Sequence, residues 1–115
     1  MSLHGEDLKL MVVEDSRVTM KALCNHLADM GIRHPLTATK GRDAMDIFHK
    51  QRPDIILLDA ILPDIDGFEV ARQIRESEQA GEWSAILFLT SMSNDSDLAR
   101  GIQAGGDDYL MKPFS

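Results

Sequence analysis

The chain has 115 residues, a formal net charge of -7 and one cysteine, and 43% of its residues are hydrophobic. This length suits one domain with one core, and the composition is ordinary for a soluble globular protein. The acidic balance argues against binding to nucleic acid or to an anionic membrane, since both require a basic surface. No apolar run could span a bilayer or form a signal peptide, and one cysteine cannot form an internal disulfide, so we expect a cytoplasmic protein.

The hydrophobic pattern predicts strands and helices that alternate along the chain. Short apolar runs without alternation are typical of strands buried on both faces, whereas apolar residues three or four apart are typical of helices. In chain order we expect a strand at 8–13, a helix from Ser16 to Met30, a strand at 35–39, a helix at 42–51, a strand at 55–58 that ends in Asp59, a helix at 68–79, a strand at 85–89, a short helix around 98–102 and a strand at 108–111. This order predicts an α/β fold with a doubly wound parallel sheet.

The segment after Asp59 is rich in residues that form turns. Pro63 lacks a backbone N–H, and Asp66 followed by Gly67 is a common turn dipeptide. We therefore expect Asp64 and Asp66 to shape this turn and not to belong to a binding site.

Polar residues of defined chemistry follow four of the expected strands. They are Glu14 and Asp15, Asp59, Thr90 with Ser91, and Lys112. Because the carboxyl ends of parallel strands lie at one edge of a sheet, we expect these side chains to meet there. Carboxylates within about 4 Å of each other repel by about 4 kcal/mol per pair at an effective dielectric constant near 20, so the acids require a cation. An all-oxygen site suits Mg²⁺ better than zinc.

The remaining residues at this edge suit phosphoryl chemistry. Lys112 supplies a positive charge and Thr90 a hydroxyl donor for phosphoryl oxygens. A carboxylate beside a divalent cation, a lysine and a hydroxyl can attack phosphorus and become an aspartyl phosphate.

Four motifs resemble the receiver domain of two-component response regulators, and the resemblance covers nearly the whole chain. They are VVED followed by Ser16, LLDAILPDIDG, FLTS and YLMKPF. The resemblance implies a flavodoxin-like, CheY-like fold with five parallel strands in the order 2-1-3-4-5. It also implies site roles: Asp59 as phosphoacceptor, Glu14, Asp15, Asp59 and the backbone carbonyl of Ile61 as Mg²⁺ ligands, Thr90 as switch hydroxyl, Tyr109 as switch aromatic and Lys112 as phosphate-binding cation, with a cis bond before Pro113.

The function that this resemblance implies is signal relay. A sensor histidine kinase or a histidine phosphotransfer protein would donate a phosphoryl group to Asp59, and the altered surface would control an output domain or a target protein. Such a domain phosphorylates and dephosphorylates itself but is not a turnover enzyme. We expect residues 1–7 to be a flexible N-terminal end and 8–115 to be the receiver domain, with no direct contact to nucleic acid or membrane.

Two departures from the family pattern lead to further expectations. Ile61 and Met92 are apolar where relatives often carry polar residues, and neither can orient an attacking water, so we expect slow self-dephosphorylation. The chain also stops at Ser115, directly after the last expected strand, whereas family members add a fifth helix. We expect that helix to be missing through truncation or disorder, or its place to be taken by another subunit.

Three alternatives compete with signal relay. An aspartate-nucleophile phosphatase of the haloacid dehalogenase type would need a second acid two residues after Asp59, where Ile61 stands. A flavodoxin-like electron carrier would need a phosphate-binding loop rich in glycine and hydroxyl groups where Glu14 and Asp15 stand. A pseudo-receiver that serves only as a non-phosphorylated interaction module would lack at least one site residue, and none is lacking here.

Overall fold

Five parallel strands form the central sheet, in the order β2-β1-β3-β4-β5. The structure is a computed structural model that describes residues 8–90 and 95–111. The strands are β1 (Leu10–Val13), β2 (Leu36–Ala38), β3 (Ile55–Asp59), β4 (Ala85–Thr90) and β5 (Asp108–Met111). The helices are α1 (Arg17–Asp29), α2 (Gly41–Gln51), α3 (Gly67–Ser77) and α4 (Asp95–Gln103). The predicted fold class and strand order are therefore confirmed.

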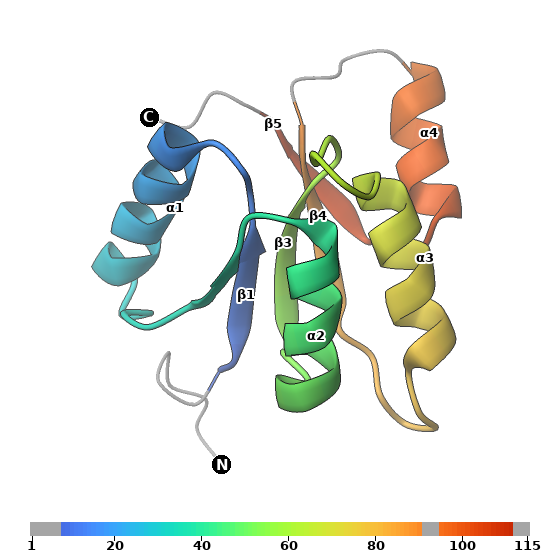
Figure 1. Cartoon of the computed structure of the whole chain (residues 1–115), viewed down its shortest axis with the longest axis horizontal. Helices are drawn as coiled ribbons and strands as arrows, with labels where there is room; N and C mark the ends of the chain where they lie inside the picture. Colours follow the sequence, from blue (N-terminus) through green and yellow to red (C-terminus); the bar gives the residue numbers. More distant parts are fainter. Residues whose placement is uncertain (1–7, 91–94, 112–115) are drawn as a thin grey trace.

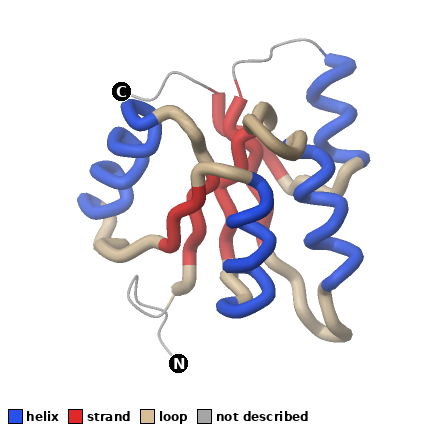
Figure 2. Tube along the Cα trace, in the orientation of Figure 1, coloured by secondary structure: helices blue, strands red, loops and turns tan. Residues whose placement is uncertain are grey.

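The helices cover both faces of the sheet, with α1 on one side and α2, α3 and α4 on the other (Figures 1 and 2). Successive residues of a strand point to opposite faces. In β3, Ile56 and Leu58 belong to the core cluster under α2 and α3, whereas Leu57 joins Leu23 and Leu27 of α1 in a second cluster. Both faces of β3 are thus buried, as its unbroken apolar run predicts.

Most expected boundaries agree with the structure to within two residues, and the largest difference is at α4, which begins at Asp95, three residues before the expected start. The first strand begins at Leu10, not at residue 8, and α3 ends at Ser77, two residues before the expected end. At that end the Ser77 hydroxyl donates to the carbonyls of Gln73 and Ile74, at 3.0 and 3.1 Å, and Glu78 is extended. The expectation that the family's fifth helix is missing concerns the segment after Met111, which lies outside the described residues. Within the described ranges no helix is long and apolar enough to cross a membrane.

The turn after Asp59 fixes the starts of two helices. Asp66 is the N-cap of α3, because its carboxylate accepts the Phe68 N–H at 2.7 Å. Asp64 caps α2 from a distance, accepting the backbone N–H groups of Gly41 at 2.8 Å and Arg42 at 3.0 Å. Lys40, the N-cap residue of α2 by position, makes no side-chain cap bond. The expectation that both acids shape this turn is consistent with these contacts.

The capping bonds of Asp64 lead to a prediction about stability in acid. Burial alone would raise the pKa of Asp64, but the N–H groups of Arg42, Gly41 and Ile65 lower it to about 2. The ionised Asp64 carboxylate therefore stabilises the fold above about pH 4, and this stabilisation is lost as the pH falls toward 2. We expect Asp64→Ala to lower the free energy of unfolding by about 1 kcal/mol at neutral pH, and the difference from wild type to shrink below about pH 4.

Urea unfolding of both proteins at a series of pH values measures this difference. Asp64→Asn is the matched control, because asparagine caps helices about as well as aspartate but does not titrate. A difference between Asp64→Ala and wild type that stays constant from pH 7 to pH 2 would contradict the prediction.

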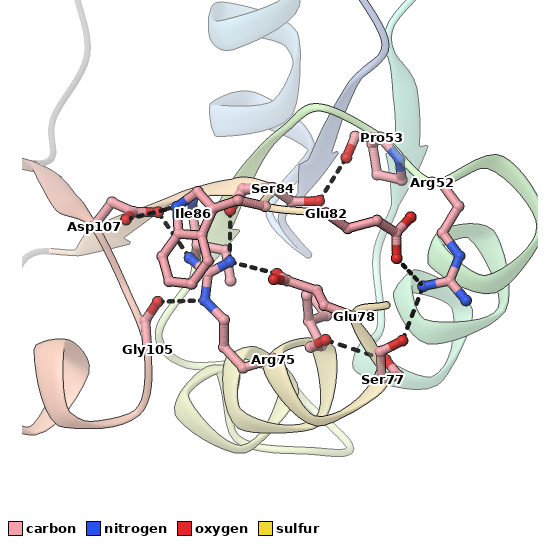
Figure 3. A network of polar contacts seen from close by, with 12 residues as sticks. Arg52, Pro53, Arg75, Ser77, Glu78, Glu82, Ser84, Ile86, Gly105 and Asp107 are labelled. Carbon is pink, nitrogen blue, oxygen red and sulfur yellow. Dashed lines mark hydrogen bonds and ion pairs between the residues drawn. The ribbon is translucent and has the colours of Figure 1, made fainter. Parts of the chain in front are cut away.

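A polar network closes the opposite, amino-terminal edge of the sheet (Figure 3). Arg75 of α3 lies at its centre. Its guanidinium donates to the carbonyls of Gly105 and Ser84, at 2.8 and 2.7 Å, and pairs with the carboxylates of Asp107 and Glu78. It also stacks on the Trp83 ring, 3.6 Å from the ring centroid. One side chain thus joins α3 to the start of β4 and to the segment between α4 and β5.

Arg52 extends this network to the end of α2 (Figure 3). Its guanidinium donates to the Ser77 carbonyl at 3.2 Å and lies 3.5 Å from the Glu82 carboxylate. Arg52 has a left-handed backbone, with φ of 48°, which allows it to end the helix. The two arginines together hold the connection between α3 and β4 against the sheet.

Candidate functional site

Polar side chains from three strand ends meet at the carboxyl edge of the sheet. Glu14 and Asp15 follow β1, while Asp59 and Thr90 are the last residues of β3 and β4. They border a pocket of about 300 Å³. Its lining residues are Glu14, Asp15, Ser16, Asp59, Ile61, Leu62, Pro63 and Thr90. The parallel sheet therefore brings together four of the residues that the sequence singled out.

The three acids form a cluster that could hold a cation. One carboxylate oxygen from each of Glu14, Asp15 and Asp59 lies within 4.8 Å of the other two. Glu14 and Asp59 are 0% and 4% exposed, whereas Asp15 is exposed. At such distances each pair of charges repels by about 3 to 4 kcal/mol at an effective dielectric constant near 20.

The donor set of this cluster fits magnesium. All three side chains offer oxygen atoms, and the pocket leaves room for water or phosphate oxygens to complete an octahedral shell. No histidine or cysteine belongs to this cluster, as zinc would favour. The residues thus fit the predicted Mg²⁺.

Backbone hydrogen bonds orient two of these acids. The Ser16 N–H donates to Glu14 Oε2 at 3.0 Å, and the Glu14 N–H donates to the Ala38 carbonyl of the neighbouring strand, also at 3.0 Å. The Ile61 N–H donates to Asp59 Oδ1 at 3.1 Å. These contacts fix the direction of the carboxylates before any ligand binds.

Ser16 has a larger part in the site than its sequence position suggested. Its side chain accepts the Thr19 N–H at 3.3 Å as the N-cap of α1, while its own N–H holds Glu14. The sequence pattern indicated only that a helix starts at Ser16. The second contact depends on the path of the chain as it leaves β1, for which the sequence carries no separate signal.

Gly67 allows α3 to begin directly behind the phosphoacceptor candidate. Its N–H donates to the Ala60 carbonyl at 3.0 Å. A Cβ atom placed on Gly67 would lie 2.9 Å from the Ala60 Cα and still closer to the Asp59 carbonyl oxygen. Only glycine permits so close an approach, which keeps the segment from Asp59 to Gly67 tight around the pocket.

The other predicted site residues have different positions. Thr90 is 3% exposed, and Ile61 lines the rim with its side chain 63% exposed. Tyr109 does not line the pocket; it is half-buried, and its ring lies 5.8 Å from that of Phe88. Lys112 lies outside the described residues, as do Ser91, Met92 and Pro113.

Comparison with known protein families identifies the chain. The family model described as the response regulator receiver domain matches residues 10–115. The chain belongs to the receiver domain family. This receiver domain therefore has the fold and the family that its motifs predicted.

Curated relatives of this receiver domain are regulators by name. The chain is 41% identical over 104 residues to the transcriptional regulatory protein AfsQ1 of Streptomyces coelicolor, covering 90% of this chain and 44% of that protein. It is 39% identical over 108 residues to the response regulator MprA of Mycolicibacterium vanbaalenii, covering 94% of this chain and 45% of that protein. The chain thus spans less than half the length of these relatives.

Solved structures agree with this assignment. The chemotaxis protein CheY4 of Vibrio cholerae superposes with a TM-score of 0.84 at 30% identity, covering 94% of this chain and 88% of that chain. The response regulator DrrB of Thermotoga maritima, an OmpR/PhoB homologue, gives a TM-score of 0.79 at 32% identity, covering 93% of this chain and 46% of that chain. The receiver fold occurs in these structures both as most of a chain and as part of a longer one.

Proposed function

We propose that this receiver domain accepts a phosphoryl group on the Asp59 carboxylate and relays it as a signal. The observation that supports this proposal is the gathering of Glu14, Asp15 and Asp59 within 4.8 Å, in a pocket that the buried Thr90 also lines. Mg²⁺, when bound, would neutralise the acids and the charge of the incoming phosphoryl oxygens. Glu14, Asp15, Asp59 and the Ile61 carbonyl would hold it.

In the proposed transfer, an Asp59 carboxylate oxygen attacks the phosphorus of a phosphohistidine. A new O–P bond forms, the P–N bond breaks, and its electron pair returns to the imidazole of the donor. Asp59 suits this role because it ends a central strand, its Oδ1 is oriented by the Ile61 N–H at 3.1 Å, and the pocket gives access to it. Lys112 and the Thr90 hydroxyl would bind phosphoryl oxygens.

The donor in this proposal is a sensor histidine kinase or a histidine phosphotransfer protein. Movement of Thr90 toward the phosphoryl group would then allow Tyr109 to change position, and with it the surface of α4 and β5. Because the named relatives are more than twice as long as the matched segment, an output domain or a target protein would read this surface. On the strength of family membership, residues 8–115 would act as the receiver in the cytoplasm, without turning over external substrates.

Intact mass spectrometry tests the proposal. The chain is incubated with Mg²⁺ and acetyl phosphate, and we expect a mass increase of one phosphoryl group. The increase should be absent in Asp59→Asn and when a chelator removes the metal. Asp46→Asn, which removes the same charge from an exposed position on α2, is the matched control and should take the label normally. Labelling of Asp59→Asn, or labelling at the same rate without Mg²⁺, would contradict the proposal.

Slow loss of the phosphoryl group remains a prediction that rests on Ile61. Its side chain lies exposed at the pocket rim and has no polar group to orient an attacking water. We therefore expect Ile61→Asn to lose its label severalfold faster than wild type, measured by timing the decay of each isolated phosphoprotein. Equal decay rates would show that this position does not control hydrolysis.

A further inference from the structure

The surface of α4 that faces the sheet has a notch at Gly101. A Cβ atom placed on Gly101 would lie 3.0 Å from the Cζ atom of Tyr109 and still closer to its hydroxyl oxygen. The same atom would lie 3.1 Å from Cε1 of Phe68. The Tyr109 hydroxyl thus occupies the space that any side chain at position 101 would fill.

The surroundings of the notch leave the tyrosine few other positions under α4. The Tyr109 ring lies 5.8 Å from that of Phe88, and Phe88 packs edge-on against Phe68 at 5.0 Å. Phe68 is 4% exposed and is covered by the Arg100 guanidinium, 4.7 Å from the ring centroid. The rings of Phe68 and Phe88 therefore border Tyr109, and residue 101 determines how much space remains between Tyr109 and α4.

A glycine inside α4 calls for such a packing reason. Glycine is among the poorest helix formers, because it loses the most backbone freedom on folding. Gly101 has no left-handed backbone that would demand glycine, unlike Gly105, with φ of 113°. The lack of a side chain at position 101 therefore allows Tyr109 and Phe68 to pack closely against α4.

We propose that Gly101 is a positioning residue for Tyr109, which keeps the ring under α4 by leaving space for its hydroxyl. A side chain at position 101 shifts the ring toward solvent, because the far end of a tyrosine moves more easily than packed backbone. The consequence for signalling rests on the proposed function, in which Tyr109 is the switch aromatic. A domain that cannot seat Tyr109 would respond less to a phosphoryl group on Asp59.

The chain contains one tyrosine, so 3-fluorotyrosine labels position 109 alone. The ¹⁹F shift difference between H₂O and D₂O then reports solvent access to the ring, without any phosphorylation. We expect a small difference in wild type, and in Gly101→Ala a difference that rises most of the way to that of the urea-unfolded chain. Ala99→Ser, a comparably small addition at an exposed position of α4, should match wild type.

A folded Gly101→Ala variant whose fluorotyrosine is as protected as in wild type would overturn the inference. If Gly101→Ala does not fold by circular dichroism, the double variant with Tyr109→Phe decides. If the double variant folds, the Tyr109 hydroxyl was what the new methyl group at position 101 collided with, which supports the inference. A double variant that stays unfolded overturns it.

Labelling with acetyl phosphate separates this inference from the proposed function. Gly101 does not line the acidic pocket, so Gly101→Ala should gain the phosphoryl mass as wild type does. Absence of labelling in wild type would count against the proposed function and leave the ¹⁹F result unaffected.

Discussion

Gly67→Ala is expected to lower the free energy of unfolding by about 3 kcal/mol, near the upper end for overpacked sites. The added Cβ would lie 2.9 Å from the Ala60 Cα and closer to the Asp59 carbonyl oxygen. Both are backbone atoms, which cannot rotate away as a side-chain end can. The strain must therefore move the start of α3 or the segment after Asp59. Urea unfolding measures the loss of stability as a lower midpoint concentration.

Gly81→Ala is the control for this prediction. Gly81 has open space where its Cβ would stand but a φ of 86°, so alanine there meets conformational strain without a collision. We expect it to cost about 1 kcal/mol, the usual penalty for a left-handed residue. If Gly67→Ala lowers the free energy of unfolding no more than Gly81→Ala does, the close approach of Gly67 to the Asp59 backbone does not require glycine at position 67.

Arg75→Ala should lower the free energy of unfolding by a similar amount, about 3 kcal/mol, as is usual when one partner of a buried ion pair is removed. The Arg75 side chain is 13% exposed, and its loss leaves Glu78, 7% exposed, without this cation. The carbonyls of Gly105 and Ser84 lose a donor, and Trp83 loses the stacked guanidinium. Chemical unfolding measures the loss.

Two further variants test the cause of that loss. Arg75→Lys keeps the charge but loses the planar fork, so we expect it to recover only a small part of the stability. Arg72→Ala, on the same helix, breaks ion pairs of a side chain that is 54% exposed, and water screens such pairs, so we expect it to lower the free energy of unfolding far less than Arg75→Ala does. Full recovery by lysine, or equal losses for the two arginines, would contradict the role given to the network.

Local patterns in the sequence predicted the sheet and most of the pocket. The run Ile55–Leu58 is apolar without alternation, which only a strand covered on both faces satisfies, and Asp59 directly follows it. Because parallel strands end at a common edge, the acids, Asp59 and Thr90 could be placed together before the structure was known. Strand order needed the resemblance to the family, since apolar runs alone do not specify neighbours.

Contacts between distant segments could not be predicted in this way. Asp64 caps a helix that begins 23 positions earlier, and nothing in the local sequence distinguishes it from an ordinary turn acid. Arg75 meets Asp107 across 32 positions, and Gly101 looks like a weak point of a helix until Tyr109 is seen beside it. Such pairs depend on tertiary packing, which hydrophobic periodicity and residue propensities in the sequence do not predict.

The Arg75 network also has a mechanical consequence for α4. Because it binds the Gly105 carbonyl and Asp107, and the Gly106 N–H donates to the Gly101 carbonyl at 3.0 Å, the trailing end of α4 is tethered to α3 and β4. The leading end, Asp95, follows Thr90 by a short connection. We expect α4 to pivot about its tether, so that a swing of about 10° carries Asp95 about 2 Å along an arc set by the helix rise. A pull at the pocket would therefore displace the leading end of α4 most and its tethered end least.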